Sequence, residues 1–236
     1  MFTESAEFYD LIYGQFKDYR EESKRVAELL RRRRPTVGTV LDVACGTGEH
    51  ARYLEESGFS VDGVDVEPAF IELAAAKNPK GRFVCQDMVE LDLGRTYDAV
   101  LCLFSSIGYV LTEQRLRSAV QKFADHTVDG GIVVVEPWFQ PGDMEDGYLG
   151  MHTAETEDIK VCRMARTRLI EGVSRIEFEY LVGRREGVER HSEVHELALF
   201  TRAQMEQAFH EASLEIEHDP EGLFGRGLYV CRKLAS

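Results

Sequence analysis

Four apolar runs in the first half of the chain each lead into a residue that could contact a small ligand. In chain order these residues are Asp42, Asp65, Asp87 and Phe104. A tight turn with Gly46 and Gly48 follows the first of them, and a helical pattern begins directly after it. The carboxyl ends of parallel strands meet at one edge of an open α/β sheet, which is where ligands bind. We therefore expect these residues to surround one ligand, and the glycines allow the backbone to approach it closely.

The glycine turn fits three kinds of ligand, which the neighbouring residues help to distinguish. Residues 46–51 match the dinucleotide fingerprint G-x-G-x-x-A, a weak signal alone, whereas no G-x-x-x-x-G-K-[ST] run indicates a P-loop. A carboxylate at Asp42 would repel a pyrophosphate, but it suits S-adenosylmethionine, whose amino and sulfonium groups are positive. Asp65 stands where a ribose-binding acid belongs, which suits this ligand and NAD equally. Asp87 and Met88 could accept a hydrogen bond from an adenine amino group and pack on its ring, which a dehydrogenase does not require.

We interpret this pattern as a pocket for the methyl donor S-adenosylmethionine. The alternatives are an NAD-dependent oxidoreductase, which rests only on the fingerprint, and a non-catalytic binding protein that keeps the fold.

The patterning around these residues predicts an α/β fold with a Rossmann-like, doubly wound and mostly parallel sheet. Apolar runs alternate with stretches of helical periodicity, which is typical of a parallel sheet covered on both faces. The expected strands are residues 39–43, 60–66, 82–85, 97–104 and 132–135. The expected helices are 17–34, 47–57, one that begins at Pro68, and one that Thr112 caps and Gly130-Gly131 breaks.

The pattern changes after Glu136, where helical periodicity is lost. Residues 175–180 alternate polar and apolar, which is typical of a half-exposed antiparallel strand. Its expected partners are 160–170 and 189–200; a capping box at Thr201 and Gln204 then opens a helix, and strands 214–218 and 228–233 follow. We therefore expect a donor-binding Rossmann-like domain of residues 1–136 and 201–236, and an antiparallel insert, 137–200, that contributes to the acceptor site.

Composition limits the partners of the protein. The 236 residues carry a formal net charge of −14 at pH 7, which disfavours nucleic acid and anionic membranes as partners. Five cysteines without a C-x-x-C pair indicate neither a disulfide framework nor a zinc site, so no metal is expected. Cys85 and Cys102 lie in apolar runs and are predicted to be buried. Without a signal peptide or an apolar run of about 18 residues, a cytoplasmic protein is expected. A homodimer is compatible with these observations, although the sequence does not give the oligomeric state.

The run Leu41-Asp42-Val43-Ala44-Cys45-Gly46-Thr47-Gly48 resembles the class I S-adenosylmethionine-dependent methyltransferases. Other segments resemble the TDP-3-aminosugar N,N-dimethyltransferases of desosamine and mycaminose biosynthesis, which methylate the 3-amino group of a nucleotide-linked deoxysugar twice. These segments are 17–19 (KDY), 104–109 (FSSIGY), 133–138 (VVVEPW) and 225–228 (GRGL). The likeness runs nearly end to end, with two departures. Phe139 stands where the family has a second tryptophan, and residues 221–224 replace a glycine-proline-serine stretch.

The strand-end pattern and the resemblance together imply three groups of site residues. The donor is expected to contact Tyr19, Asp42, Ala44, Gly46, Gly48, Asp65, Asp87, Met88, Leu103 and Phe104. The acceptor, a small molecule that the resemblance identifies as a TDP-linked aminosugar, is expected to contact Tyr9, Tyr13, Ser106, Trp138 and Arg226. Tyr109, Glu136 and His195 are the candidate catalytic residues, with Glu136 expected to accept a hydrogen bond from the substrate amine.

The expected reaction is a direct displacement with the amine as nucleophile, in which positioning supplies much of the rate. Another small-molecule amine or a hydroxyl compound stays open as the acceptor.

Overall fold

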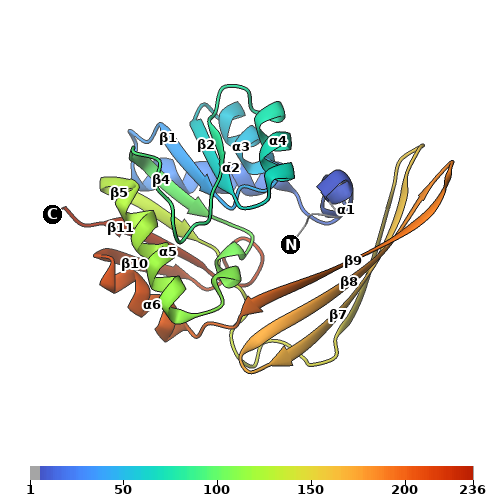
Figure 1. The fold of residues 1–236 in the computed structure, drawn as a ribbon. Helices are drawn as coiled ribbons and strands as arrows, with labels where there is room; N and C mark the ends of the chain where they lie inside the picture. Colours follow the sequence, from blue (N-terminus) through green and yellow to red (C-terminus); the bar gives the residue numbers. More distant parts are fainter. Residues whose placement is uncertain (1–5, 236) are drawn as a thin grey trace.

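A computed structural model of the chain describes residues 6–235. Its centre is a seven-stranded sheet with the strand order β10-β11-β5-β4-β1-β2-β3 (Figure 1). The strands are β1 (Thr39–Val43), β2 (Ser60–Asp65), β3 (Phe83–Cys85), β4 (Tyr97–Cys102), β5 (Thr127–Val135), β10 (Leu214–Asp219) and β11 (Leu228–Lys233). The first five run parallel to one another, whereas β11 is antiparallel to β5 and β10 is antiparallel to β11. The predicted doubly wound, mostly parallel sheet is confirmed.

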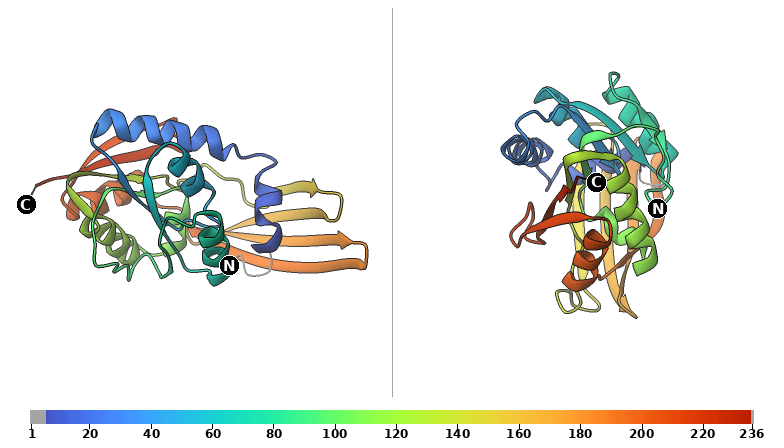
Figure 2. Two further views of the ribbon diagram at one scale, coloured as in Figure 1. Left: turned by 90° about the horizontal axis from the view of Figure 1, so that it is seen from above. Right: turned by 90° about the vertical axis from the view of Figure 1, so that its left-hand side faces the viewer.

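Apolar residues of the strands alternate between two layers, one on each face of the sheet. The helices are α2 (Tyr19–Arg33), α3 (Glu49–Glu56), α4 (Pro68–Lys77), α5 (Glu113–Asp125) and α6 (Arg202–Glu211). In β5, Ile132 and Val134 pack in the layer of α2 and α3, whereas Val133 and Val135 pack in the layer of α5 and α6. This period of two is what an extended strand imposes, and it explains the continuous apolar runs. Figure 2 shows helices on both sides of the sheet.

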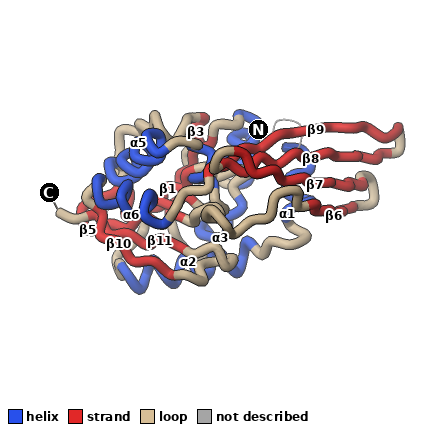
Figure 3. Tube along the Cα trace, turned by 90° about the horizontal axis from the view of Figure 1, so that it is seen from below, coloured by secondary structure: helices blue, strands red, loops and turns tan. Residues whose placement is uncertain are grey.

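A second, four-stranded antiparallel sheet is inserted between β5 and α6. It consists of β6 (Leu149–Glu155), β7 (Lys160–Ile170), β8 (Val173–Arg184) and β9 (Gly187–Ala198), in that order. The sheet projects from the rest of the molecule as long, narrow strands (Figures 1 and 3). Three of its strands are expected from the sequence: β8 from the alternation over 175–180, and β7 and β9 as the partners of that strand. The fourth strand, β6, is not predicted from the sequence, because its apolar residues Leu149 and Met151 are exposed.

The N-terminal segment lies between α4 and the second sheet. It forms a short helical turn, η1 (Ala6–Phe8), and a one-turn helix, α1 (Tyr9–Tyr13). Tyr9 contacts Phe70 of α4, and Phe8 contacts Tyr180 of β8. The aromatic residues near the N-terminus therefore join the two sheets through one shared apolar cluster.

Two local expectations are wrong. Gly130-Gly131 does not break a helix: α5 already ends at Asp125, and both glycines lie inside β5 beside a bulge against β4. A Cβ on Gly131 would lie 2.9 Å from the Asp98 carbonyl oxygen, so the close approach of the two backbones requires glycine. Cys85 is exposed rather than buried because β3 is a short strand at the edge of the sheet. Across residues 6–235, no helix is long and apolar enough to cross a membrane.

Candidate active site

The turn after β1 has a backbone conformation that requires outside support. Ala44 and Gly46 both have positive φ, at 58° and 54°, and such values are unfavourable for a residue with a Cβ. The Gly46 N–H donates to Asp65 Oδ2 at 2.9 Å, and the Glu67 N–H donates to Asp65 Oδ1 at 3.0 Å. Burial raises the pKa of Asp65, while these backbone N–H bonds oppose the rise. Asp65 thus fixes the turn and is itself held in one orientation.

Two neighbouring cavities lie at the carboxyl ends of the parallel strands, at the point where the strand order reverses between β1 and β4. The larger has a volume of about 460 Å³, and the smaller, about 40 Å³, reaches the end of β1. We refer to both as the donor cavities. The predicted donor residues that line them are Tyr19, Asp42, Ala44, Gly46, Asp65, Asp87, Met88, Leu103 and Phe104. The strand-end residues therefore line two neighbouring cavities at one edge of the sheet, close to the single space that the sequence predicts.

Gly48 departs from this expectation, since it lines neither donor cavity. It precedes α3 with a φ of 79°. A Cβ there would lie 2.6 Å from Asn78 Nδ2 and 3.0 Å from Ala74, so the glycine lets α3 and α4 approach each other.

Asp42 carries a buried charge that the chain does not fully satisfy. Its exposed fraction is 1%, and within residues 6–235 its Oδ2 atom has no hydrogen-bond partner. Burial raises its pKa to about 6, and His50 opposes the rise. A buried carboxylate oxygen without a partner is costly, so a cationic group in the small cavity would be well placed here.

Asp87 is engaged by the chain as well as facing the larger donor cavity. Its Oδ1 accepts from the Val89 N–H at 3.0 Å, and its Oδ2 accepts from Arg115 Nη2 at 2.7 Å. Arg115 lies on α5 and lines the same cavity. Sequence reasoning missed this arginine because nothing distinguishes it from other cations on an exposed helix surface.

A third cavity, of about 640 Å³, lies between the two sheets and is called the acceptor cavity here. The predicted acceptor residues Tyr9, Tyr13, Ser106, Trp138 and Arg226 all line it. Four residues line both this cavity and the larger donor cavity, namely Tyr9, Ser106, Tyr109 and His195. A group passing from donor to acceptor would therefore cross this junction.

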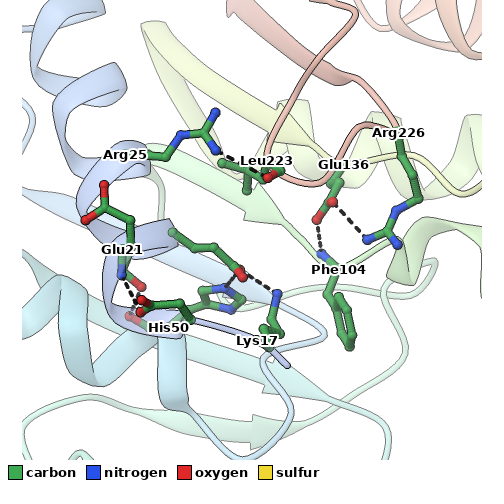
Figure 4. Close-up of polar contacts among 11 residues, drawn as sticks. Lys17, Glu21, Arg25, His50, Phe104, Glu136, Leu223 and Arg226 are labelled. Atoms are coloured by element: carbon green, nitrogen blue, oxygen red, sulfur yellow. Dashed lines mark hydrogen bonds and ion pairs between the residues drawn. The ribbon is translucent and has the colours of Figure 1, made fainter. Parts of the chain in front are cut away.

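Glu136 does not lie at the junction. Its side chain is fully buried and lines none of the three cavities. Its Oε2 accepts from the Phe104 N–H at 2.7 Å, and its Oε1 accepts from Arg226 Nη2 at 3.0 Å (Figure 4). Phe104 and Ser105 have φ values of 53° and 63°, which makes this turn strained. The geometry therefore makes Glu136 a support for the turn and for Arg226, rather than a partner of the substrate amine.

A second buried network lies beside the Phe104 ring. Lys17 Nζ and His50 Nε2 both contact Glu22 Oε2, the latter at 3.0 Å (Figure 4). Lys17 Nζ is 4.0 Å from the centroid of the Phe104 ring, and burial lowers the pKa of Lys17. Lys17 belongs to the KDY segment, which is the one sequence signal that pointed to it.

Arg163 of β7 is the acceptor-cavity residue that sequence reasoning missed. It is only 4% exposed, and its guanidinium carbon lies 4.9 Å from the Tyr13 ring centroid and 4.6 Å from that of Phe178. Its Nη2 lies 3.3 Å from His152 Nδ1. Among residues 6–235, no acceptor bonds to its Nε or Nη1, and no carboxylate oxygen lies within 4.0 Å of it. One arginine in a strand of mixed polarity carries no pattern that would mark it in advance.

Comparison with known proteins places this site among methyltransferases. Residues 40–131 match the family described as "Methyltransferase domain". A relative from Streptomyces fradiae, dTDP-3-amino-3,6-dideoxy-alpha-D-glucopyranose N,N-dimethyltransferase, is 41% identical over 96% of this chain and 90% of its own length.

Solved structures agree with this result along nearly the whole chain. The crystal structure of Streptomyces venezuelae DesVI has a TM-score of 0.92 at 35% identity, covering 98% of this chain and 99% of that one. S-adenosylmethionine-bound CalS10, an amino pentose methyltransferase from Micromonospora echinaspora, has a TM-score of 0.84 at 36% identity, covering 93% of each chain.

Proposed function

We propose a function from one premise: the chain belongs to the family of TDP-aminosugar N,N-dimethyltransferases, within the S-adenosylmethionine-dependent methyltransferases. The proposed reaction moves the methyl group of S-adenosylmethionine to the amino group of a TDP-linked aminodeoxysugar, by direct displacement. The observation that carries the proposal is the junction of a donor cavity with a larger acceptor cavity at the carboxyl ends of the strands.

The donor cavities fit the parts of S-adenosylmethionine by charge. Asp65, Asp87 and Met88 line the larger donor cavity, where Asp65 would accept from the ribose hydroxyls and Asp87 and Met88 would hold the adenine. The small cavity at Asp42 would take the amino acid part, whose ammonium group supplies the missing partner of Oδ2. Opposite charge in a buried site favours this orientation over one that places a phosphate against Asp42.

The acceptor cavity fits a nucleotide-linked sugar through its rings and its cations. Trp138, Phe139 and Phe178 provide apolar faces, and Arg226 and Arg163 provide positive charge. Arginine pairs with phosphate oxygens through two parallel hydrogen bonds, so either guanidinium could hold the diphosphate. Arg163 has the larger electrostatic need, because Arg226 is already paired with Glu136. The sugar amine would then lie towards Tyr9, Ser106 and Tyr109.

Neither cavity belongs to one segment of the chain alone. Residues 1–136 and 201–236 are proposed to bind the donor, yet Arg175, Val194 and Glu196 of the insert line the larger donor cavity. Conversely, Tyr9, Tyr13 and Phe16 from the N-terminal segment line the acceptor cavity. The insert and the N-terminal segment therefore close the site together.

Turnover of a TDP-3-aminosugar by the purified protein tests the proposal directly. With S-adenosylmethionine present, mass spectrometry should show the sugar nucleotide gaining one and then two methyl groups. Release of S-adenosylhomocysteine in equal amount would show that the donor supplies them. If other amines or hydroxyl compounds gain methyl groups while no TDP-aminosugar does, the donor assignment stands and the acceptor is wrong.

An acceptor other than a TDP-aminosugar is favoured by one observation. Phe139, where the resemblance leads us to expect a second tryptophan, lies in the acceptor cavity with its ring 4.7 Å from that of Trp138. A phenylalanine ring is smaller than an indole, so this position admits an acceptor of a different shape. The values of kcat/KM for a panel of nucleotide-linked aminosugars and free amines would distinguish a TDP-aminosugar from another acceptor.

A further inference from the structure

A chain of three polar side chains leads away from the junction of the cavities into the second sheet. The Tyr109 hydroxyl lies 2.9 Å from His195 Nδ1, and His195 Nε2 lies 3.5 Å from Glu193 Oε2. Tyr109 belongs to the short helical turn η2 (Ser106–Val110), whereas the other two residues lie on β9. Glu193 and His195 are two positions apart on one strand, so their side chains leave the same face of the sheet.

The three residues differ in their access to the cavities. Tyr109 and His195 line both the donor and the acceptor cavity, whereas Glu193 lines neither. The Glu193 side chain is 2% exposed and that of His195 is 1% exposed. The arrangement therefore begins where the reacting amine would lie and ends at a carboxylate that substrate does not reach.

The contacts favour one tautomer of His195. A carboxylate only accepts hydrogen bonds, so Glu193 favours a proton on Nε2 and leaves Nδ1 as the acceptor for the Tyr109 hydroxyl. Burial raises the pKa of Tyr109 well above its usual range, so this phenol is a neutral donor. The same logic of an acid that orients an imidazole recurs in hydrolytic triads. The 3.5 Å contact is long, as such bonds often are without bound ligand.

Other groups around the imidazole and carboxylate are mostly neutral rings. The Tyr180 hydroxyl of β8 donates to Glu193 Oε2 at 3.1 Å, and the Phe178 ring lies 5.2 Å from that of His195. Burial raises the pKa of the Tyr13 phenol of α1, Arg163 opposes the rise, and the charge of Glu193 adds to it. The guanidinium group of Arg163, on β7, stacks on the Phe178 ring. Among residues 6–235, Glu193 is therefore the carboxylate that lies within 4.0 Å of the His195 imidazole.

We propose that Tyr109, His195 and Glu193 form a proton relay for the reacting amine, with Glu193 as a positioning residue that acts through His195. The inference rests on the proposed function, because it requires an amine at the junction. An ammonium group would pass a proton to the Tyr109 oxygen while the Tyr109 proton moves to His195 Nδ1, and Glu193 stabilises the resulting imidazolium.

Once the relay has removed the proton, the amine can attack the methyl group of the donor. The freed nitrogen lone pair forms the new N–C bond, and the C–S bond breaks with its electron pair moving to sulfur, which becomes a neutral thioether. The methylated nitrogen is positive again and carries two protons. After the imidazolium has returned its proton to solvent through the cavity, the relay can remove one of these two, so the second methylation needs the relay as much as the first.

Glu193→Gln and Tyr109→Phe test the relay, measured on the full-length protein with a TDP-3-aminosugar. Both variants are expected to lower kcat at pH 7 by about 100-fold, the usual lower contribution of general acid–base catalysis. KM and the Kd for S-adenosylhomocysteine should stay near the wild-type values. The deficit should shrink as pH approaches the pKa of the amine, because free amine then needs no relay, and monomethylated product should accumulate at pH 7.

A purely structural role would not produce that pH dependence. Glu179→Gln is the matched control, because Glu179 is an exposed β8 carboxylate paired with Arg190 at 2.9 Å; it should behave as wild type. Tyr109→Phe keeps the ring, so it remains informative if Glu193→Gln does not fold. Wild-type kcat in either folded variant, or a deficit that is constant with pH, would overturn the relay. Turnover by the wild-type protein tests the proposed function separately. If the wild type methylates a different amine, the same variants are compared on that amine. If it methylates no amine, both proposals fail.

Discussion

The donor cavities and the acceptor cavity are built in different ways. Most of the donor walls come from short turns that directly follow β1, β2, β3 and β4, so these residues lie next to a strand end in the sequence. Residues of the N-terminal segment, of α5 and of the insert complete the walls. The acceptor walls come from α1, the segment after β5, the second sheet and the loop before β11. The donor half is therefore assembled mainly by local chain geometry, and the acceptor half by the packing of distant segments.

The two halves also differ in charge, in a way that suits their proposed ligands. Asp42, Asp65 and Asp87 place carboxylates around the donor, whose amino and sulfonium groups are positive. Arg163 and Arg226 place guanidinium groups around the acceptor, whose diphosphate is negative. The donor acids are oriented largely by backbone N–H groups, whereas Arg226 depends on Glu136 and Arg163 lacks a carboxylate among the described residues. Substrate charge is thus expected to matter more to the acceptor half.

The largest effect is expected from Asp65→Ala, which should weaken S-adenosylhomocysteine binding by about 100-fold or more. Each hydrogen bond from a ribose hydroxyl to the carboxylate contributes about 1.5–3 kcal/mol, and about 1.4 kcal/mol is a factor of ten. The change also leaves the Gly46 and Glu67 N–H groups without their acceptor. Isothermal titration calorimetry measures the loss.

Asp98→Ala is the matched control for that change. Asp98 likewise accepts from two backbone N–H groups, those of Gly38 and Thr39, both at 3.0 Å, but it lines neither donor cavity. It should lower the midpoint of thermal unfolding and leave the Kd for S-adenosylhomocysteine unchanged. If both variants lose the ligand equally, Asp65 acts through stability and not through contact.

Arg163→Met should raise KM for a TDP-aminosugar about tenfold or more, through the loss of a charged hydrogen bond to phosphate. The Kd for S-adenosylhomocysteine should stay the same, which would sharpen the division between the two halves. The thermal midpoint should not fall, because a buried charge without an opposite charge costs several kcal/mol, while stacking on rings returns about 2 kcal/mol. Steady-state kinetics and calorimetry measure the two effects.

Arg190→Met provides the comparison on the same sheet, since Arg190 is an exposed β9 cation paired with Glu179. It should change neither quantity. An unchanged KM in Arg163→Met would mean that the diphosphate lies elsewhere, and Arg226 would be left as its partner.

The smallest effect is a pH dependence of donor binding that comes from Asp42. Its pKa is raised to about 6 in the free protein, and a bound ammonium group favours the ionised form. Binding therefore releases a proton when pH is below about 6, so affinity should fall by about tenfold per pH unit as pH drops further. Calorimetric titrations with S-adenosylhomocysteine from pH 5 to pH 8 measure this. Asp42→Asn should bind more weakly at pH 8 and should show no such slope; a slope that persists would assign the proton to another group.

Much of the core fold could be predicted because its strands are short, apolar and regularly spaced. The predicted strand 39–43 coincides with β1, and 160–170 coincides with β7. The capping box at Thr201 and Gln204 is present at the start of α6. The errors occurred where local pattern is ambiguous: Gly130-Gly131 reads as a helix break, yet tertiary pairing with β4 extends the strand through it. Strand β6 carries the apolar residues Leu149 and Met151 on its exposed face, so its pattern does not indicate which face is buried.

The sequence by itself determined the strand-end wall of the donor half, because a strand, a glycine turn and an acid at the next strand end are local features with a fixed spatial consequence. Only the tertiary structure decided the acceptor half. It buried Glu136 against Arg226 and Phe104, away from the donor and acceptor cavities. It also brought Tyr109 to His195, 86 residues away, and enclosed Arg163 among rings of α1 and β8. Such contacts depend on how two sheets and an N-terminal segment pack, and no periodicity in the chain records that packing.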